Sequence, residues 1–292
     1  YLANFLLKKG FKVYGIYRRS SSDNLWRLRY FNIINKVSLF DIDLKESIEV
    51  FNLIRKLKPN QIYNLAAQSF VQTSFTNPHE TTQTNAIAVL NLLESIKSLK
   101  LDCGFYQAST SEMFGNINSV KQGELSGFYP RSPYAVAKLY AHYLCKNYRE
   151  AYNMSIYSGI LFNHESPLRG MEFVTRKITF FLAQYYLKQN NILELGNIYS
   201  KRDWGFAGEY VEVMHKILVS NKAFDYVVGT GKTTSIKQFI NYCLKHLNIK
   251  YQWEGMGINE VCIDKKNNKV FIRINKKFYR PTEVNFLKAD IT

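Results

Sequence analysis

A tyrosine and a lysine four residues apart give the first indication of chemistry. Tyr134 and Lys138 open a segment of helical periodicity, and residues i and i+4 of a helix share one face. A phenol has an ordinary pKa of about 10, and a nearby ammonium group lowers it. Such a pair can take the proton of a hydroxyl group while hydride leaves the same carbon. This spacing is common by chance, so its context decides its weight.

Two neighbouring strings supply that context. Pro-Arg-Ser-Pro occupies 130–133, directly before Tyr134, and Ser-Thr-Ser-Glu occupies 109–112, at the end of an expected strand. In parallel sheets, ligands gather at the carboxyl ends of the strands. We therefore expect Glu112 to lie near Tyr134.

The elements that position these residues alternate between short apolar runs and longer periodic runs. We expect strands over 12–17, 37–43, 61–67, 105–109 and 155–162, and helices over 2–9, 45–57, 80–99 and 134–151. This alternation predicts an α/β fold, a Rossmann-type doubly wound parallel sheet covered on both faces. Beyond 162 the pattern loosens around helices expected over 174–187, 208–219 and 235–247. That change predicts a smaller, interleaved C-terminal substrate domain.

Composition excludes several classes of protein. The 292 residues are 46% hydrophobic and 15% aromatic, which is typical of a folded globular chain. No apolar run has the length of a membrane helix. The four cysteines form no CxxC pair, so we expect neither a disulfide framework nor a metal site, and we expect a cytoplasmic protein. The formal net charge is +16, but its lysines are scattered, so we predict neither a nucleic-acid nor a membrane partner.

Seven strings together resemble one known family. They are 17–22 (YRRSSS), 64–69 (NLAAQS), 105–112 (FYQASTSE), 128–134 (FYPRSPY), 159–167 (GILFNHESP), 201–205 (KRDWG) and 279–284 (YRPTEV). The chain resembles the extended short-chain dehydrogenase/reductases, and within them the GDP-mannose 4,6-dehydratases. The resemblance spans nearly the whole chain in the expected order.

The resemblance implies a lyase reaction on GDP-mannose with NADP as cofactor. Tyr134, assisted by Lys138, takes the C4 hydroxyl proton, and Thr110 hydrogen-bonds that oxygen. Glu112 removes the C5 proton and water leaves from C6, giving GDP-4-keto-6-deoxymannose. An epimerase needs no second base at this place, so Glu112 favours the dehydratase.

The resemblance also implies the binding residues. Cofactor contacts fall on Arg18, Arg19, Asp43, Leu44, Leu65, Ala66, Ala67, Ser69, Lys138, His164 and Arg169. Substrate contacts fall on Asn163, Val174, Lys177, Arg202, Arg280 and Glu283. Arginines after the 12–17 strand suit a ribose 2′-phosphate, where an acidic residue would bind a 2′-hydroxyl. We therefore expect NADP rather than NAD.

The same resemblance implies the organisation of the chain. Residues 1–163 would form the NADP-binding domain and 164–292 mainly the substrate domain, with segments near 203–230 returning to the first. The assembly would be a homodimer or homotetramer. The family begins with a strand and a glycine-rich turn ahead of the position of Tyr1, and it continues beyond Thr292. We therefore expect a chain clipped at both ends that, made as written, binds NADP poorly.

Some features depart from the pattern or imitate another one. Glu80 stands where the family commonly has a tyrosine near the cofactor. The string 229–233 (GTGKT) imitates a phosphate-binding loop, but the pattern requires glycine at Tyr226. The alternatives left open are another NADP-dependent nucleotide-sugar dehydratase, an epimerase, or a catalytically silent NADP-binding scaffold.

Overall fold

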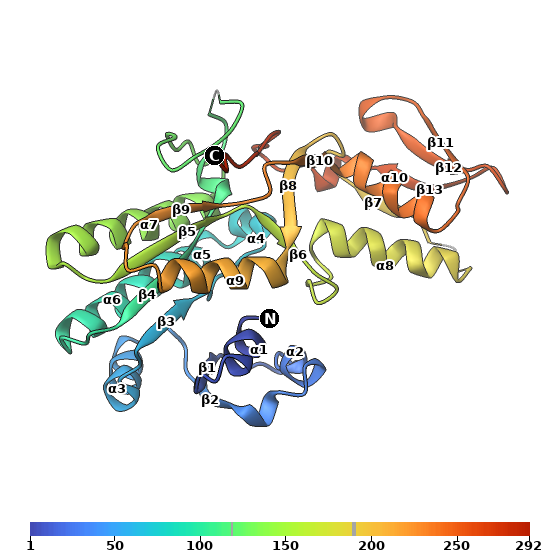
Figure 1. Ribbon diagram of the computed structural model, residues 1–292. Coiled ribbons are helices and arrows are strands. Elements are labelled where there is room, and N and C mark those ends of the chain that lie inside the picture. Colours follow the sequence, from blue (N-terminus) through green and yellow to red (C-terminus); the bar gives the residue numbers. More distant parts are fainter. Residues whose placement is uncertain (118, 189–190) are drawn as a thin grey trace.

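A parallel four-stranded sheet organises the larger part of the molecule. The computed structural model describes residues 1–117, 119–188 and 191–292. The sheet has the order β3 (Gln61–Asn64), β4 (Gly104–Thr110), β5 (Ile156–Leu161) and β9 (Asp225–Val228), with every neighbour parallel. Figure 1 shows it flanked by helices, among them α7 and α9. All six residues of β5 are buried, as expected for a central strand covered on both faces.

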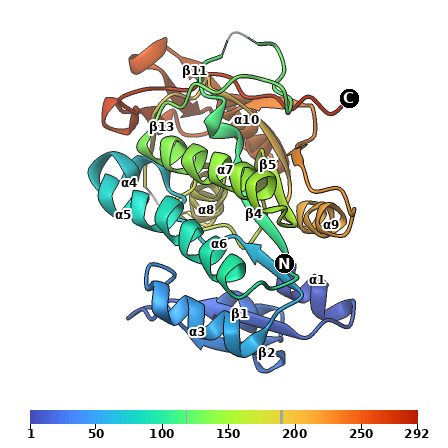
Figure 2. The same cartoon turned by 90° about the vertical axis from the view of Figure 1, so that its left-hand side faces the viewer.

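A second parallel pair precedes this sheet in the chain. It joins β1 (Val13–Tyr17) to β2 (Val37–Asp41). Among the described residues, neither strand is hydrogen-bonded to β3. This pair lies beside the larger sheet at its β3 side (Figure 2). Packing of α3 (Ser47–Leu57) against α6 (Ala88–Ser98) joins the two parts.

The remaining helices of this part are mostly short. They are α1 (Leu2–Lys8), α2 (Trp26–Tyr30), α4 (Val71–Thr76), α5 (Pro78–Thr82), α7 (Pro133–Tyr152) and α9 (Ala207–Leu218). The single helix expected over 80–99 is divided, because a π-helical segment, Gln83–Ile87, separates α5 from α6. Within that segment, the Asn85 side chain accepts from the Gln68 amide (2.8 Å) and donates to the Gln68 carbonyl (3.0 Å). The loop after β3 is held by these bonds.

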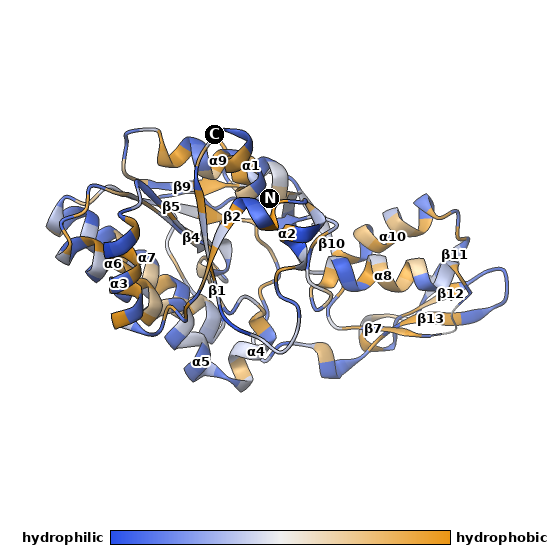
Figure 3. Ribbon diagram, turned by 90° about the horizontal axis from the view of Figure 1, so that it is seen from below, coloured by the Kyte–Doolittle hydropathy of each residue, from blue (hydrophilic) through white to orange (hydrophobic). Residues whose placement is uncertain are grey.

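A smaller lobe follows α7 and β5 in the chain. Helices α8 (Val174–Tyr186) and α10 (Ile236–His246) pack on a sheet of order β11 (Tyr251–Glu254), β12 (Val261–Asp264), β13 (Lys269–Ile274) and β7 (Leu193–Leu195). Their apolar faces form a separate core that includes Ile178, Leu182, Ile240 and Phe271. Figure 3 shows this lobe to one side of the larger sheet, with hydrophobic stretches in both helices.

A three-stranded sheet lies between the two parts. Its order is β10 (Thr233–Ser235), β8 (Lys201–Phe206) and β6 (Asn163–Glu165). Within β8, the Asp203 carboxylate is fully buried and accepts from the amides of Thr230, Gly231 and Ala289 and from the Thr230 hydroxyl. The amides of the phosphate-loop-like string are therefore satisfied by the protein's own carboxylate. This accounts for the string without any nucleotide.

The observed fold confirms the predicted class, an α/β protein with parallel sheets and covering helices. The strands expected up to residue 162 are present: β4 is longer than expected and the others are shorter. The long helices are present within about two residues of the expected bounds, except the divided helix over 80–99. Within the described residues, no helix is long and apolar enough to cross a membrane.

Candidate active site

A cavity of about 460 Å³ lies at the carboxyl ends of β3, β4 and β5 and reaches the smaller lobe. Its walls come from the loops after these strands, from the start of α7 and α8, and from the segment that follows β13. Its volume is in the range of small-molecule sites. The sequence predicted that functional residues follow these strands, and the cavity lies at the ends of the same strands.

The N-terminus of α7 brings Tyr134 and Lys138 into this cavity. Ser132 is the N-cap, because its hydroxyl accepts from the Ala135 amide (3.1 Å), and Pro133 occupies the first turn. Both residue types favour a helix start. The tyrosine and the lysine therefore lie one turn apart on the buried face, 8% and 4% exposed.

Burial controls the ionisation of this pair. It raises the pKa of Tyr134 to about 12, against the effects of a hydrogen bond from Thr110 and the charge of Arg169. Burial also lowers the pKa of Lys138 to about 8. The Lys138 ammonium donates to the Ala108 carbonyl (3.0 Å). Burial therefore outweighs the opposing hydrogen bond and positive charge, and it favours the protonated phenol of Tyr134 at neutral pH.

Thr110 and Glu112 enter the cavity from the end of β4. Thr110 is the last residue of that strand, and its hydroxyl accepts from the Glu112 amide (3.3 Å) across a short 3-10 turn, Ser111–Met113. Because α7 packs against β4, both residues share the cavity with Tyr134. All of the residues predicted to be catalytic line one space.

Two arginines flank the Glu112 carboxylate. Arg202 Nε lies 3.7 Å from one of its oxygens and Arg280 Nη1 lies 3.6 Å from the other. The Arg202 side chain is 9% exposed, and burial lowers its pKa, against the opposing charge of Glu112. These residues come from the 3-10 turn Ser111–Met113, from β8 and from the C-terminal segment. A buried arginine and a half-buried arginine beside a carboxylate can bind an anionic ligand and orient that carboxylate.

All residues predicted to bind substrate line the same cavity, namely Asn163, Val174, Lys177, Arg202, Arg280 and Glu283. Some of them already have protein partners. Lys177 donates to the Glu194 carbonyl (2.7 Å) and lies over the Phe278 ring. The Glu283 carboxylate accepts from the Arg280 amide (2.9 Å).

The residues predicted to bind cofactor divide into two groups. Leu65, Ala67, Ser69, Lys138, His164 and Arg169 line the cavity. Arg18, Arg19, Asp43, Leu44 and Ala66 are not among the residues that line it. Arg18 and Asp43 lie together, with 3.8 Å between Nη1 and Oδ2. Leu44 packs against the hydrophobic core, while the Arg19 amide donates to Asp41 (2.9 Å).

The sequence analysis missed several cavity residues. Glu165, Glu172, Phe173, Asn197, Trp204 and Lys277 also line the space. Glu165 accepts from the Thr175 hydroxyl (2.7 Å), and burial raises its pKa. Most of these residues stand where the sequence lacks clear periodicity. Their position within or shortly after strands is the signal that could have indicated these cavity residues.

Comparison with solved structures defines the class of this fold. A dTDP-glucose 4,6-dehydratase from Streptomyces venezuelae, DesIV, "with NAD and TYD bound", superposes with a TM-score of 0.80 at 17% identity, covering 99% of this chain and 84% of that one. A UDP-glucose 4-epimerase from Thermus thermophilus superposes with a TM-score of 0.78 at 19% identity, covering 99% and 86%. The chain thus has the Rossmann-type α/β fold of these nucleotide-sugar dehydratase and epimerase structures.

Sequence comparison is more specific. A family model described as GDP-mannose 4,6 dehydratase matches residues 1–292. The GDP-mannose 4,6 dehydratase of Drosophila melanogaster is 45% identical over 298 aligned positions, 99% of this chain and 75% of the relative. The enzyme of that name from Homo sapiens is 44% identical, over 100% and 81%. This chain belongs to the GDP-mannose 4,6-dehydratase family, as the sequence motifs predicted.

Proposed function

We propose that this protein removes water from GDP-mannose and forms GDP-4-keto-6-deoxymannose. The observation that carries this proposal is the presence of Glu112 in the same cavity as Tyr134 and Thr110. A dehydratase needs a base for the C5 proton in addition to the base for the C4 hydroxyl. Membership of the family supports the same substrate, and another dehydratase or an epimerase is not favoured.

Each side chain has a role in the proposed mechanism. Tyr134 takes the proton of the C4 hydroxyl, and Thr110 donates a hydrogen bond to that oxygen. The Lys138 ammonium favours the phenolate that forms. Glu112 takes the C5 proton, which the C4 ketone has acidified, and the hydroxyl of C6 leaves as water. A nicotinamide dinucleotide held beside Lys138 and His164 would supply a hydride acceptor for C4 and a hydride donor for C6. With a proton returned to C5, the net change would be the loss of one water and no net redox change.

Binding of the sugar nucleotide would use the other cavity residues. Arg202, Arg280 and Lys177 offer positive charge for a diphosphate. Asn163 offers a polar side chain and Val174 an apolar one. Glu283 offers a carboxylate that can accept from a base. These assignments rest on the resemblance and on a shared position along one cavity.

We propose that the cofactor is a nicotinamide dinucleotide and, more narrowly, NADP. The residues fit such a group: Arg169 Nε is buried without a hydrogen-bond partner in the described part of the chain, although Glu165 lies 3.4 Å away. Lys138, His164 and the segment 65–69 surround the same space. Arg18 and Arg19 follow β1 and would hold the 2′-phosphate, with Asp43 and Leu44 beside the adenine.

The proposed organisation follows from the same family. Residues 1–163 form the dinucleotide-binding domain and 164–292 the substrate domain, and the pairing of β9 with β5 supports the return of part of the second segment. A homodimer or homotetramer is supported by the exposed apolar side chains of Val136, Tyr140 and Tyr143 on α7. A cytoplasmic location is supported by four unpaired cysteines.

A single incubation tests the reaction. Two proteins are mixed with GDP-mannose and catalytic NADP⁺. One is the chain as it stands, and the other carries a relative's N-terminal strand and glycine-rich turn ahead of Tyr1. Mass spectrometry should detect loss of one water from GDP-mannose. Glu112→Gln should abolish this loss, while Glu150→Gln, an equal charge change on the exposed side of α7, should retain it. If another nucleotide sugar reacts while GDP-mannose stays intact, the proposed substrate is wrong. If the cofactor binds but no nucleotide sugar reacts, a catalytically silent scaffold is favoured.

A further inference from the structure

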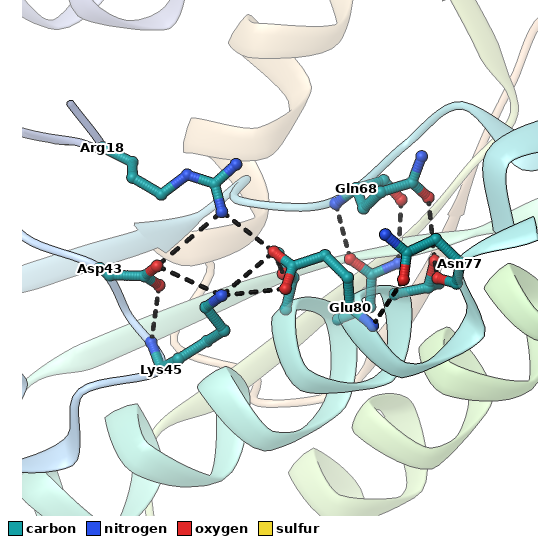
Figure 4. Close-up of polar contacts among 9 residues, drawn as sticks. Arg18, Asp43, Lys45, Gln68, Asn77 and Glu80 are labelled. Atoms are coloured by element: carbon teal, nitrogen blue, oxygen red, sulfur yellow. Dashed lines mark hydrogen bonds and ion pairs between the residues drawn. The ribbon is translucent and has the colours of Figure 1, made fainter. Parts of the chain in front are cut away.

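An ion-pair network joins the ends of β1 and β2 to helix α5. Arg18 Nη1 donates to Glu80 Oε1 at 3.0 Å and lies 3.8 Å from Asp43. Lys45 Nζ lies 3.0 Å from Glu80 Oε2 and 3.4 Å from Asp43. Figure 4 shows Glu80 between the two cations. This carboxylate is the member of the network that holds Arg18 most closely.

Glu80 is itself fixed on the larger sheet's side of the molecule. It lies in the first turn of α5, where its amide donates to the Asn77 side chain (3.4 Å). The Thr84 hydroxyl donates to Oε1 (3.2 Å). Arg18 directly follows β1, and Lys45 follows β2. The network therefore bridges two parts whose sheets share no hydrogen bonds within the described residues.

The charges of the network balance. Two carboxylates face two cations, so the group has no net formal charge. Hydrogen bonding from Lys45, and then from Arg18, lowers the pKa of Glu80, and hydrogen bonding to Glu80 raises the pKa of Lys45. Glu80 and Lys45 are thus ionised at neutral pH. The Arg18 side chain is 62% exposed, so a ligand can reach it.

We propose that Glu80 is a cofactor-specificity residue that holds Arg18 and weakens the preference for a 2′-phosphate. This inference rests on the proposed dinucleotide-binding function. A phosphate dianion must take Arg18 from Glu80 and Asp43 and is repelled by both carboxylates. A 2′-hydroxyl carries no charge and can donate a hydrogen bond to a carboxylate. Glu80 therefore penalises NADP and is nearly neutral toward NAD.

Equilibrium binding tests the proposal without reference to turnover. Dissociation constants for NADP⁺ and NAD⁺ are measured by titration calorimetry on the full chain with the N-terminal extension used above. Glu80→Gln keeps the size and polarity of the side chain. Removal of its charge should tighten NADP⁺ binding roughly three- to tenfold and leave NAD⁺ binding within about twofold. The matched control Glu150→Gln should change neither, and raised salt should reduce the gain.

A second variant tests whether the effect depends on Arg18. Arg18→Gln should weaken NADP⁺ binding selectively. Adding Glu80→Gln to it should give a smaller gain than Glu80→Gln gives alone, because only the repulsion of the phosphate by Glu80 is then removed. The inference is overturned if Glu80→Gln leaves the ratio of the NADP⁺ and NAD⁺ dissociation constants unchanged. It is also overturned if Glu80→Gln tightens NADP⁺ binding equally with and without Arg18. Neither result contradicts the proposed cofactor. Failure of both dinucleotides to bind any variant overturns the proposed cofactor together with the inference.

Discussion

A buried ion pair between α7 and β9 gives the sharpest stability prediction. Arg149 Nη1 and Nη2 donate to the two Asp225 oxygens at 3.0 and 3.2 Å. Their side chains are only 10% and 12% exposed. Arg149→Met removes both bonds and leaves the carboxylate buried without its cation, so we expect a loss of about 3–5 kcal/mol of unfolding free energy. Urea unfolding followed by tryptophan fluorescence measures it.

The pH dependence of this loss identifies its cause. His142 Nε2 lies 3.7 Å from Asp225. Burial lowers the pKa of His142 from 6.5, opposed by Asp225 and assisted by Arg149. Wild-type stability therefore falls as the pH falls below the pKa that His142 has in the unfolded state, because the unfolded state binds the proton more readily than the folded state. Without Arg149, Asp225 raises the pKa of His142, so the variant recovers part of its loss at low pH.

Measurements at pH 8 and pH 5.5 should thus give a larger loss at the higher pH. Arg55→Met is the control, because Arg55 is exposed and its contacts with Asn52 and Phe51 lie within its own helix. We expect a change within about 0.5 kcal/mol. Adding Asp225→Asn to Arg149→Met should restore stability, since no unpaired charge remains. A loss below about 1 kcal/mol, or one independent of pH, would refute the reasoning.

Two further substitutions test the supports of the cavity. Asp203→Asn replaces the carboxylate oxygen that accepts from the Gly231 and Ala289 amides with a donor group. We expect a loss of about 3–6 kcal/mol of unfolding free energy, measured by urea unfolding. Unchanged stability would contradict the assigned hydrogen bonds. Ser132→Ala removes the N-cap of α7 and should cost about 1 kcal/mol in the same assay, with a fall in kcat because Tyr134 is less well placed; unchanged stability and kcat would refute a positioning role.

The sequence specified most of the local structure. Periodicity predicted the long helices, and the helix expected from residue 134 begins at Pro133. Alternating strands and helices predicted the parallel sheet, and this topology requires the residues after each strand to share one edge. The residues for catalysis and substrate binding were named from the family motifs, and in the structure they line one cavity.

The tertiary structure decided the partners of those residues. Arg202 and Arg280 pair with Glu112 although they lie in distant segments of the chain. Asp203 accepts hydrogen bonds from the Thr230 and Gly231 amides, in the string that resembles a phosphate-binding loop. Burial raises the pKa of Tyr134, which the spacing of Tyr134 and Lys138 did not indicate. The sequence marked Glu80 only as a departure, and folding placed it against Arg18. Pairings between residues far apart in the chain depend on packing, which local spacing does not encode.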